Sequence, residues 1–258
     1  MSLLLKSPIF VFSQTPRKKA SKMALKSHAT SIASSSSSSG EKRKLPVLLF
    51  DIMDTIVRDP FYYDVPAFFR MSLEELIDCK HPNAWIDFEK GLINETEFAR
   101  KFFKDGRSFD LEGLKSCMRK GYSYIEDVEG LLEALKQNKY EIHAFTNYPI
   151  WYEMIEDKLK LSNYLSWTFC SCKFGKRKPE ADFYLEVLRH LKVEPASCIF
   201  IDDRIKNVEV AVDVGIIGLH FKNAYSLCQD LSLLGIDISS NESNVKQDLD
   251  KTAKEYLP

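Results

Sequence analysis

The stretch LLFDIMDTIVRD, from Leu48 to Asp59, decides the fold of this chain. It continues the apolar run LPVLLF, in which polar and apolar residues do not alternate. Such a run is typical of a strand that is covered on both faces, as in a parallel sheet. The run ends at Asp51, and Asp54 follows three residues later. A strand that ends in carboxylates indicates a chemical role for that end.

Four further apolar runs predict the other strands of a parallel sheet. They are EIHAFT at 141–146, SWTFCS at 166–171, SCIFID at 197–202 and GIIGLHF at 215–221. Segments with helical spacing of apolar residues lie between them, such as DVEGLLEALKQN and EADFYLEVLRHLKV. Alternating strands and helices favour right-handed crossovers. We therefore predict an α/β fold with a doubly wound parallel sheet of the Rossmann-like kind.

Residues 60–125 interrupt this alternation. No strand run occurs there, and the segment has the pattern of several short helices. Eleven of the 49 residues from 61 to 109 are aromatic, against 12% for the whole chain. We predict a helical cap over 60–125, inserted between two core segments at 45–59 and 126–237. Most of its aromatic side chains are expected to form the cap's own core, and some to line a pocket for a flat ligand.

The two ends of the chain differ in composition from the rest. The first 40 residues contain 12 serines and six lysines or arginines but no acidic residue. This composition is typical of an organelle transit peptide. We predict that residues 1–44 are a transit peptide and linker, which uses the plastid import machinery and directs the protein to the chloroplast stroma. The alternatives are a mitochondrial destination and a plain disordered tail. Residues 238–258 are polar and are expected to form a C-terminal tail.

Charge, hydropathy and cysteine spacing argue against several classes of function. The formal net charge is −1, and since the first 40 residues are basic, the remainder is more acidic. That balance argues against a nucleic-acid-binding role. No apolar run is long enough to span a membrane. The six cysteines are scattered, which favours free thiols in a reducing compartment over a metal site.

Polar residues stand at the strand ends, where an open parallel sheet binds its ligands. The set consists of Asp51, Thr146, Asn147, Asp202 and Asp203, with Lys178 before the helix that precedes the fourth strand. Clustered carboxylates repel one another unless a cation neutralises them, and hard oxygen ligands suit Mg²⁺. A carboxylate in such a site can attack phosphorus, while hydroxyl, amide and ammonium groups hold the phosphoryl oxygens. Aspartates that cap helices are the alternative interpretation.

The pieces FDIMDT, FTN, KRKP and FIDDRIKNVEVA, in this order, resemble the four motifs of the haloacid dehalogenase-like hydrolases. The resemblance covers roughly residues 46–222 and includes the position of the cap. It implies that Asp51 is the nucleophile, that Thr146 binds the phosphoryl group and that Lys178 neutralises nucleophile and phosphate. It also implies that Asp203, with Asp202 behind it, completes a Mg²⁺ site that Asn207 supports.

The first motif departs from the pattern of the phosphatases in this superfamily. They usually have a second aspartate two residues after the nucleophile, as general acid and base, where this chain has Met53. The carbonyl of Met53 can ligate a metal, but its side chain cannot act as an acid. Asp54 stands one residue later, in place of the usual glycine. It is either a displaced acid or a turn residue that bonds its own backbone.

Longer stretches, among them CKHPNAWIDFEKGLI and LSWTFCSCKFGKRKP, are similar to the flavin mononucleotide (FMN) hydrolases of plant plastids. That resemblance implies Mg²⁺-dependent release of riboflavin and phosphate, and it alone supplies the substrate. The aromatic residues considered for stacking on the flavin are Trp85, Phe88, Tyr148 and Trp151. The alternatives are a sugar phosphate or nucleotide phosphatase, a 2-haloacid dehalogenase, and a non-catalytic module that binds flavin or phosphate.

Overall fold

The computed structural model describes residues 45–239, so the predictions for the leader and for most of the C-terminal tail lie outside the described residues. Five strands form one parallel sheet in the order β3-β2-β1-β4-β5. They are β1 (Val47–Phe50), β2 (Glu141–Thr146), β3 (Ser166–Cys170), β4 (Cys198–Asp202) and β5 (Ile217–His220). Each strand lies inside one of the five apolar runs. The predicted doubly wound α/β fold is confirmed.

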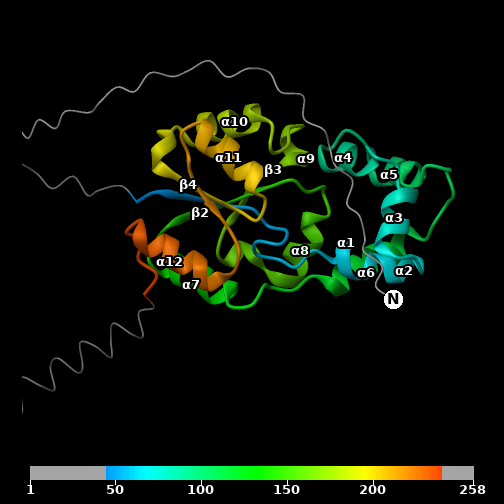
Figure 1. Ribbon diagram of the computed structural model, residues 1–258, viewed down its shortest axis with the longest axis horizontal. Helices are drawn as coiled ribbons and strands as arrows, with labels where there is room; N and C mark the ends of the chain where they lie inside the picture. Colours follow the sequence, from blue (N-terminus) through cyan, green and yellow to red (C-terminus); the bar gives the residue numbers. More distant parts are fainter. Residues whose placement is uncertain (1–44, 240–258) are drawn as a thin grey trace, which may run out of the picture. The chain divides into compact units, whose positions relative to one another are not determined.

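Helices cover both faces of the sheet, because alternate residues of each strand point to opposite faces and both sets are apolar. In β1, Leu48 and Phe50 belong to one core cluster, whereas Val47 and Leu49 belong to the other. Figure 1 shows α10 (Ala181–Leu191) and α11 (Ile205–Asp213) over one face and α7 (Val128–Gln137), α8 (Tyr152–Leu159) and α12 (Ala224–Leu233) over the other. The sheet is therefore buried on both sides.

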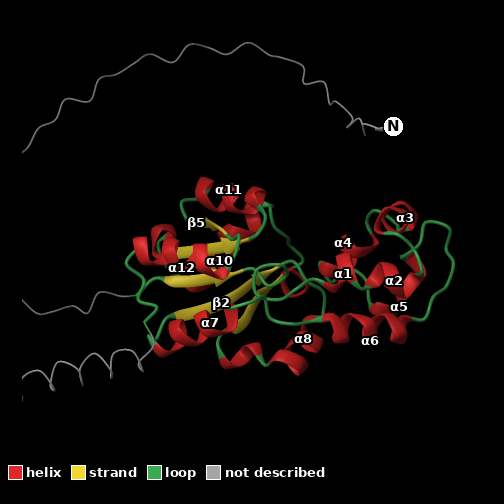
Figure 2. Cartoon of the chain, turned by 60° about the horizontal axis from the view of Figure 1, so that its bottom comes forward, coloured by secondary structure: helices red, strands yellow, loops and turns green. Residues whose placement is uncertain are grey.

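Six helices occupy the range assigned to the cap, and none of the five sheet strands lies there. They are α1 (Pro60–Tyr63), α2 (Val65–Phe69), α3 (Leu73–Cys79), α4 (Ala84–Glu89), α5 (Glu95–Lys101) and α6 (Leu111–Gly121). Ser72 and Asn94 start α3 and α5 with capping boxes, which define where these short helices begin. Figure 2 shows the six helices gathered beyond one end of the strands.

Aromatic packing joins the cap to the core. The rings of Phe88 and Phe98 stack with centroids 4.7 Å apart, and Trp151, just before α8, packs edge-on against both. The Trp151 indole Nε1 also donates a hydrogen bond to Glu95 of α5. Closely packed rings tolerate little displacement. These contacts therefore hold the cap in place beside the sheet.

Neither a membrane span nor a disulfide occurs in the part of the chain that the structure describes. No helix there is long and apolar enough to cross a bilayer. All six cysteines lie within it and are free thiols.

Candidate active site

The carboxyl ends of three neighbouring strands bring the predicted polar residues together. Asp51 follows β1, Thr146 ends β2, and Asp202 and Asp203 stand at the end of β4. Lys178 approaches them from the turn before α10. One carboxylate oxygen from each of the three aspartates lies within 4.8 Å of the other two. Parallel strands end at the same edge, so residues distant in sequence meet there.

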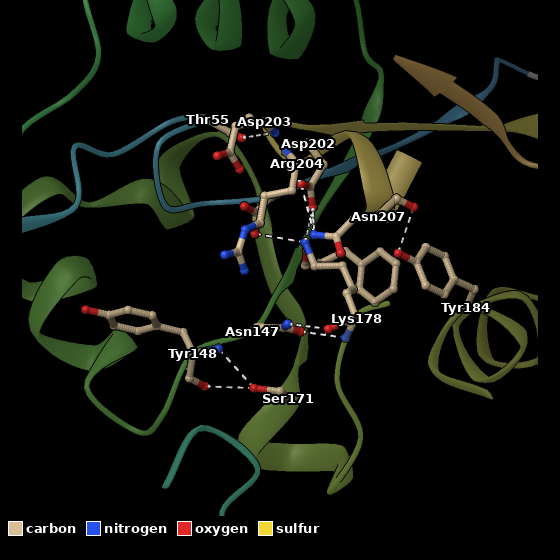
Figure 3. A network of polar contacts seen from close by, with 12 residues as sticks. Thr55, Asn147, Tyr148, Ser171, Lys178, Tyr184, Asp202, Asp203, Arg204 and Asn207 are labelled. Carbon is tan, nitrogen blue, oxygen red and sulfur yellow. Dashed lines mark hydrogen bonds and ion pairs between the residues drawn. The ribbon is translucent and has the colours of Figure 1, made fainter. Parts of the chain in front are cut away.

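Lys178 is the centre of a buried ion network (Figure 3). Its Nζ donates to Asp51 Oδ1 at 2.9 Å, to Asp202 Oδ2 at 2.6 Å and to the Phe145 carbonyl at 2.6 Å. The side chain is only 1% exposed. Burial lowers the pKa of Lys178, but Asp202 and Asp51 raise it by more, so its pKa lies above the ordinary value. The ammonium therefore stays charged between two carboxylates.

Asp202 has both carboxylate oxygens occupied by donors of the chain itself. Asn207 Nδ2 donates to both oxygens, at 3.0 and 2.9 Å, and the Arg204 N–H donates to Oδ1 at 2.8 Å. Asp202 is fully buried and does not line the cavity, whereas Asp203 and Asn207 do. Asp202 thus positions Lys178 and Asn207, and Asp203 is the aspartate of the pair that is open to a ligand.

The acidic groups of the site fit a divalent cation. Burial raises the pKa of Asp51 to about 6, although Lys178 opposes the rise. Burial, followed by repulsion from Asp51 and Asp202, raises the pKa of Asp203 to about 7. Carboxylates with raised pKa values gain stability when a cation neutralises them. Their hard oxygen atoms, close together beside a cavity, are the ligands that Mg²⁺ prefers.

Thr146 and Asn147 use their side chains differently. Within residues 45–239, the Thr146 hydroxyl is the one buried side-chain polar group that has no hydrogen-bond partner. Such a group costs free energy unless a ligand bonds it, which agrees with the predicted phosphoryl contact, although Thr146 is only 1% exposed and does not line the cavity. The Asn147 amide instead bonds the backbone of Lys178: Oδ1 accepts from its N–H and Nδ2 donates to its carbonyl, both at 2.8 Å. The Asn147 side chain thus positions Lys178, and because Asn147 also lines the cavity, its contact with phosphate stays a prediction.

The turn after β1 shows what Asp54 does. Asp54 has a φ of 54°, in the left-handed region that aspartate tolerates. Its Oδ1 accepts a hydrogen bond from the backbone N–H of Asp59 at 3.0 Å. This hydrogen bond supports the interpretation of Asp54 as a turn residue that bonds nearby backbone. Met53 and Asp54 both line the cavity.

A cavity of about 390 Å³ lies between the strand ends and the cap, within the usual size range of small-molecule sites. Asp51, Lys178 and Asp203 form its charged end. The cap lines it with Phe61, Tyr62, Ile77, Lys80, Trp85, Glu89 and Phe102. The cavity therefore combines an ionic end with a wall that contains both aromatic and charged side chains.

The four aromatic residues considered for a flavin fall into two groups. Trp85 and Tyr148 line the cavity, whereas Phe88 and Trp151 do not. Phe88 and Trp151 are each 2% exposed and pack against Phe98. We therefore assign Phe88 and Trp151 to the packing between cap and core instead of to a flavin contact. Trp85 and Tyr148 are the two that a ligand in this cavity can touch.

Several cavity residues were not among the residues predicted from the sequence. Arg177 forms an ion pair with Glu89, which is only 3% exposed. Burial raises the pKa of Glu89, and Arg177 opposes that rise. Arg204 and Asp59 also line the cavity. Two of these residues had a signal in the sequence. Arg177 is a basic residue beside Lys178, and Asp59 comes directly before Pro60, which starts α1.

The model of the haloacid dehalogenase-like hydrolase family matches residues 46–215, the region that contains the cap and four of the five strands. The chain therefore belongs to the haloacid dehalogenase-like hydrolases, and the resemblance seen in its four motifs is confirmed.

Known relatives agree with this assignment. The chain is 67% identical over 207 residues to flavin mononucleotide hydrolase 1 of Arabidopsis thaliana, described as chloroplastic, covering 79% of this chain and 84% of that protein. It is 26% identical over 171 residues to a sesquiterpene phosphatase of Aspergillus oryzae, covering 64% and 86%. A family enzyme of Bacteroides thetaiotaomicron, solved with magnesium and inorganic phosphate, superposes with a TM-score of 0.57 at 19% identity, covering 70% and 96%. The last similarity supports the fold.

Proposed function

We propose that this protein is a Mg²⁺-dependent phosphatase that hydrolyses FMN to riboflavin and phosphate through an aspartyl-phosphate on Asp51. The most direct structural support is the buried network of Lys178 and carboxylates at the charged end of an aromatic cavity. The relative that is 67% identical is named for FMN hydrolysis. That relative's description also supports our proposal that residues 1–44 direct this protein to plastids.

Asp51 is held in position to act as the nucleophile. Its backbone N–H donates to the Ile201 carbonyl at 2.9 Å, and its Oδ1 accepts from Lys178. The second carboxylate oxygen attacks phosphorus, the bond to the riboflavin oxygen breaks, and water then hydrolyses the acyl phosphate. Mg²⁺, held by the carboxylates of Asp51 and Asp203 and the Met53 carbonyl, would supply positive charge beside the phosphoryl oxygens.

Lys178 and Thr146 stabilise the phosphoryl oxygens as charge shifts during the reaction. The Lys178 ammonium is already charged and fixed by three hydrogen bonds, so it needs little reorganisation. The Thr146 hydroxyl, which has no partner within the described residues, donates to a phosphoryl oxygen. These two residues make the site complementary to a phosphomonoester.

The aromatic wall selects the organic part of the substrate. Trp85 of α4 and Tyr62 of α1 line the cavity from the cap, and Tyr148 lines it from the core. Aromatic side chains bind a flat ring system by stacking and edge contacts. A small sugar phosphate leaves much of this aromatic surface exposed to water, so it gains less binding free energy from it. The wall therefore favours a large flat substrate such as FMN.

The test is a substrate panel with the full-length protein and Mg²⁺, measuring riboflavin and phosphate release. We expect kcat/KM for FMN to exceed that for a sugar phosphate, a nucleoside monophosphate and farnesyl phosphate. Farnesyl phosphate is the specific competitor, because the 26% identical relative is named a sesquiterpene phosphatase. If the protein prefers farnesyl phosphate, that compound and not FMN is its substrate. Chloride release from a 2-haloacid without Mg²⁺ would indicate a dehalogenase, and flavin binding without turnover a non-catalytic module.

A further inference from the structure

The proposed reaction needs a proton donor that the first motif lacks. Riboflavin leaves as an alkoxide, which requires a proton. Met53 has no acidic group, and Asp54 Oδ1 accepts a hydrogen bond from the Asp59 N–H, so Asp54 is tested beside Asp59 as the control. Asp59 itself lines the same cavity. Resting on the proposed function, we propose that Asp59 is the general acid for the leaving group and then the general base for the attacking water.

Asp59 stands where the core continues into the cap. Its Oδ1 accepts a hydrogen bond from the Phe61 N–H at 2.9 Å and so caps α1. Its own N–H donates to Asp54 Oδ1 at 3.0 Å, which fixes the backbone from the other side. Within residues 45–239, no hydrogen bond to Asp59 Oδ2 is seen, so this oxygen is available to hold and transfer a proton. The bond from the Phe61 N–H keeps the carboxyl group in one orientation.

The surroundings of Asp59 bring its titration closer to neutral pH than that of an exposed aspartate. Burial raises the pKa of Asp59 to about 6 and outweighs the hydrogen bond from the Phe61 N–H. The negative charges of Asp54 and Asp51 add to this rise, while Arg204 opposes it. A general acid works best when its pKa lies near the operating pH. Asp59 therefore has both the position and the acidity for this role.

Three tyrosine hydroxyls complete the group of titratable side chains around Asp59. Tyr122 and Tyr148 are buried, and their hydroxyl oxygens lie 2.8 Å apart in a hydrogen bond. Tyr62 lines the cavity. Burial raises the pKa of all three, and the charge of Asp59 raises each further. The three tyrosines therefore stay neutral at the pH at which Asp59 gains or loses its proton.

The two steps balance in protons and electrons. In the first, the Asp51 carboxylate attacks phosphorus, the electron pair of the breaking P–O bond goes to riboflavin oxygen, and Asp59 supplies the proton. In the second, water attacks phosphorus and gives a proton to the Asp59 carboxylate. The acyl-phosphate bond breaks, phosphate leaves, and both aspartates return to their starting states. No further reactant is required.

The test compares two leaving groups in Asp59→Asn, because asparagine retains the oxygen that caps α1. Riboflavin needs a proton to leave, whereas the phenolate of p-nitrophenyl phosphate does not. In a single turnover, we expect riboflavin release to slow by about 10²–10⁴-fold. The first equivalent of nitrophenolate should appear at close to the wild-type rate. A slow steady state should follow, since hydrolysis of the phosphoenzyme lacks its base.

Asp54→Asn is the matched control. Its amide oxygen can still accept the Asp59 N–H, so we expect a smaller loss that is equal for both substrates. Wild-type release of riboflavin by Asp59→Asn overturns the proposal, as does an equal slowing of both leaving groups in the first turnover. The proposal is also overturned if Asp54→Asn slows riboflavin release more than it slows nitrophenolate release. If the wild-type protein does not cleave FMN, the FMN assignment fails, and the leaving-group comparison uses whichever alkyl phosphate is cleaved.

Discussion

The core and the cap line one cavity but are held by different interactions. On the core side, a single buried ammonium, that of Lys178, lies between the carboxylates of Asp51 and Asp202. On the cap side, stacked and edge-on rings such as Phe88 and Phe98 provide the contacts. Loss of the shared ammonium leaves two buried carboxylates unpaired, whereas loss of a ring leaves an apolar cavity. We infer that the core determines whether reaction occurs and the cap determines which substrate reacts.

The largest effect expected is on the core side, in Asp51→Asn. The amide cannot attack phosphorus, so kcat should fall by a factor on the order of 10⁵–10⁶, the scale observed when an enzyme loses its nucleophile. Riboflavin release under saturating FMN measures it. A thermal melt close to that of the wild type is the control for folding. Turnover within tenfold of the wild type would exclude the aspartyl-phosphate.

Lys178→Met is expected to affect stability as well as turnover. It leaves Asp51 and Asp202 buried without their shared cation, which should lower the free energy of unfolding by about 3–5 kcal/mol. Urea unfolding measures this quantity. Lys206→Met, at an exposed position of α11, is the matched control and should change it by less than about 0.5 kcal/mol. Equal stability of the two variants would contradict the role of the ion network.

Removal of Mg²⁺ tests the charge balance of the core at two pH values. The pKa values of Asp51 and Asp203 are about 6 and about 7 in the folded protein, against 3.8 as their ordinary value. The folded state then binds more protons than the unfolded one, so metal-free stability from these groups falls as pH rises through this window. Mg²⁺ replaces those protons. At 100 times its Kd it should raise the free energy of unfolding by about 3 kcal/mol.

Calorimetric melting with and without Mg²⁺ checks this prediction. We expect the increase in Tm to be clearly larger at about pH 8 than at about pH 5, because protons compete with the metal at the lower pH. Asp203→Asn should reduce the increase at both. The same increase at both pH values would show that these carboxylates do not hold the metal.

The smallest effect concerns two residues of α4 that differ in what they face. Trp85 lines the cavity, so Trp85→Leu should raise KM for FMN by about 2–10-fold, as loss of an aromatic contact of about 0.5–1.5 kcal/mol implies. KM for p-nitrophenyl phosphate should change little. Phe88 is packed against Phe98, so Phe88→Leu should lower stability by about 1 kcal/mol without changing either KM. The reverse pattern would mean that the cap presents its other face to the substrate.

Much of the fold could be predicted because its signals are local. A strand buried on both faces is an uninterrupted apolar run, and each such run here contains a strand. The chemistry at the strand ends was predictable as well. Asp51, Thr146 and Asp202 follow directly from where the runs stop, and parallel pairing brings such ends to one edge. Local sequence is sufficient when the rule depends only on neighbours along the chain.

The division of work within the site depends on contacts between distant segments. Asn147 bonds the backbone of Lys178, 31 residues away, and the motif alone did not distinguish this from a direct phosphate contact. Likewise, helical spacing cannot tell which of Trp85 and Phe88 faces a ligand, because that depends on where the cavity lies once the cap has packed against the core. The residues of the site follow from strand periodicity and end position. Their roles follow from side-chain packing and hydrogen bonding, which exist only once the chain has folded.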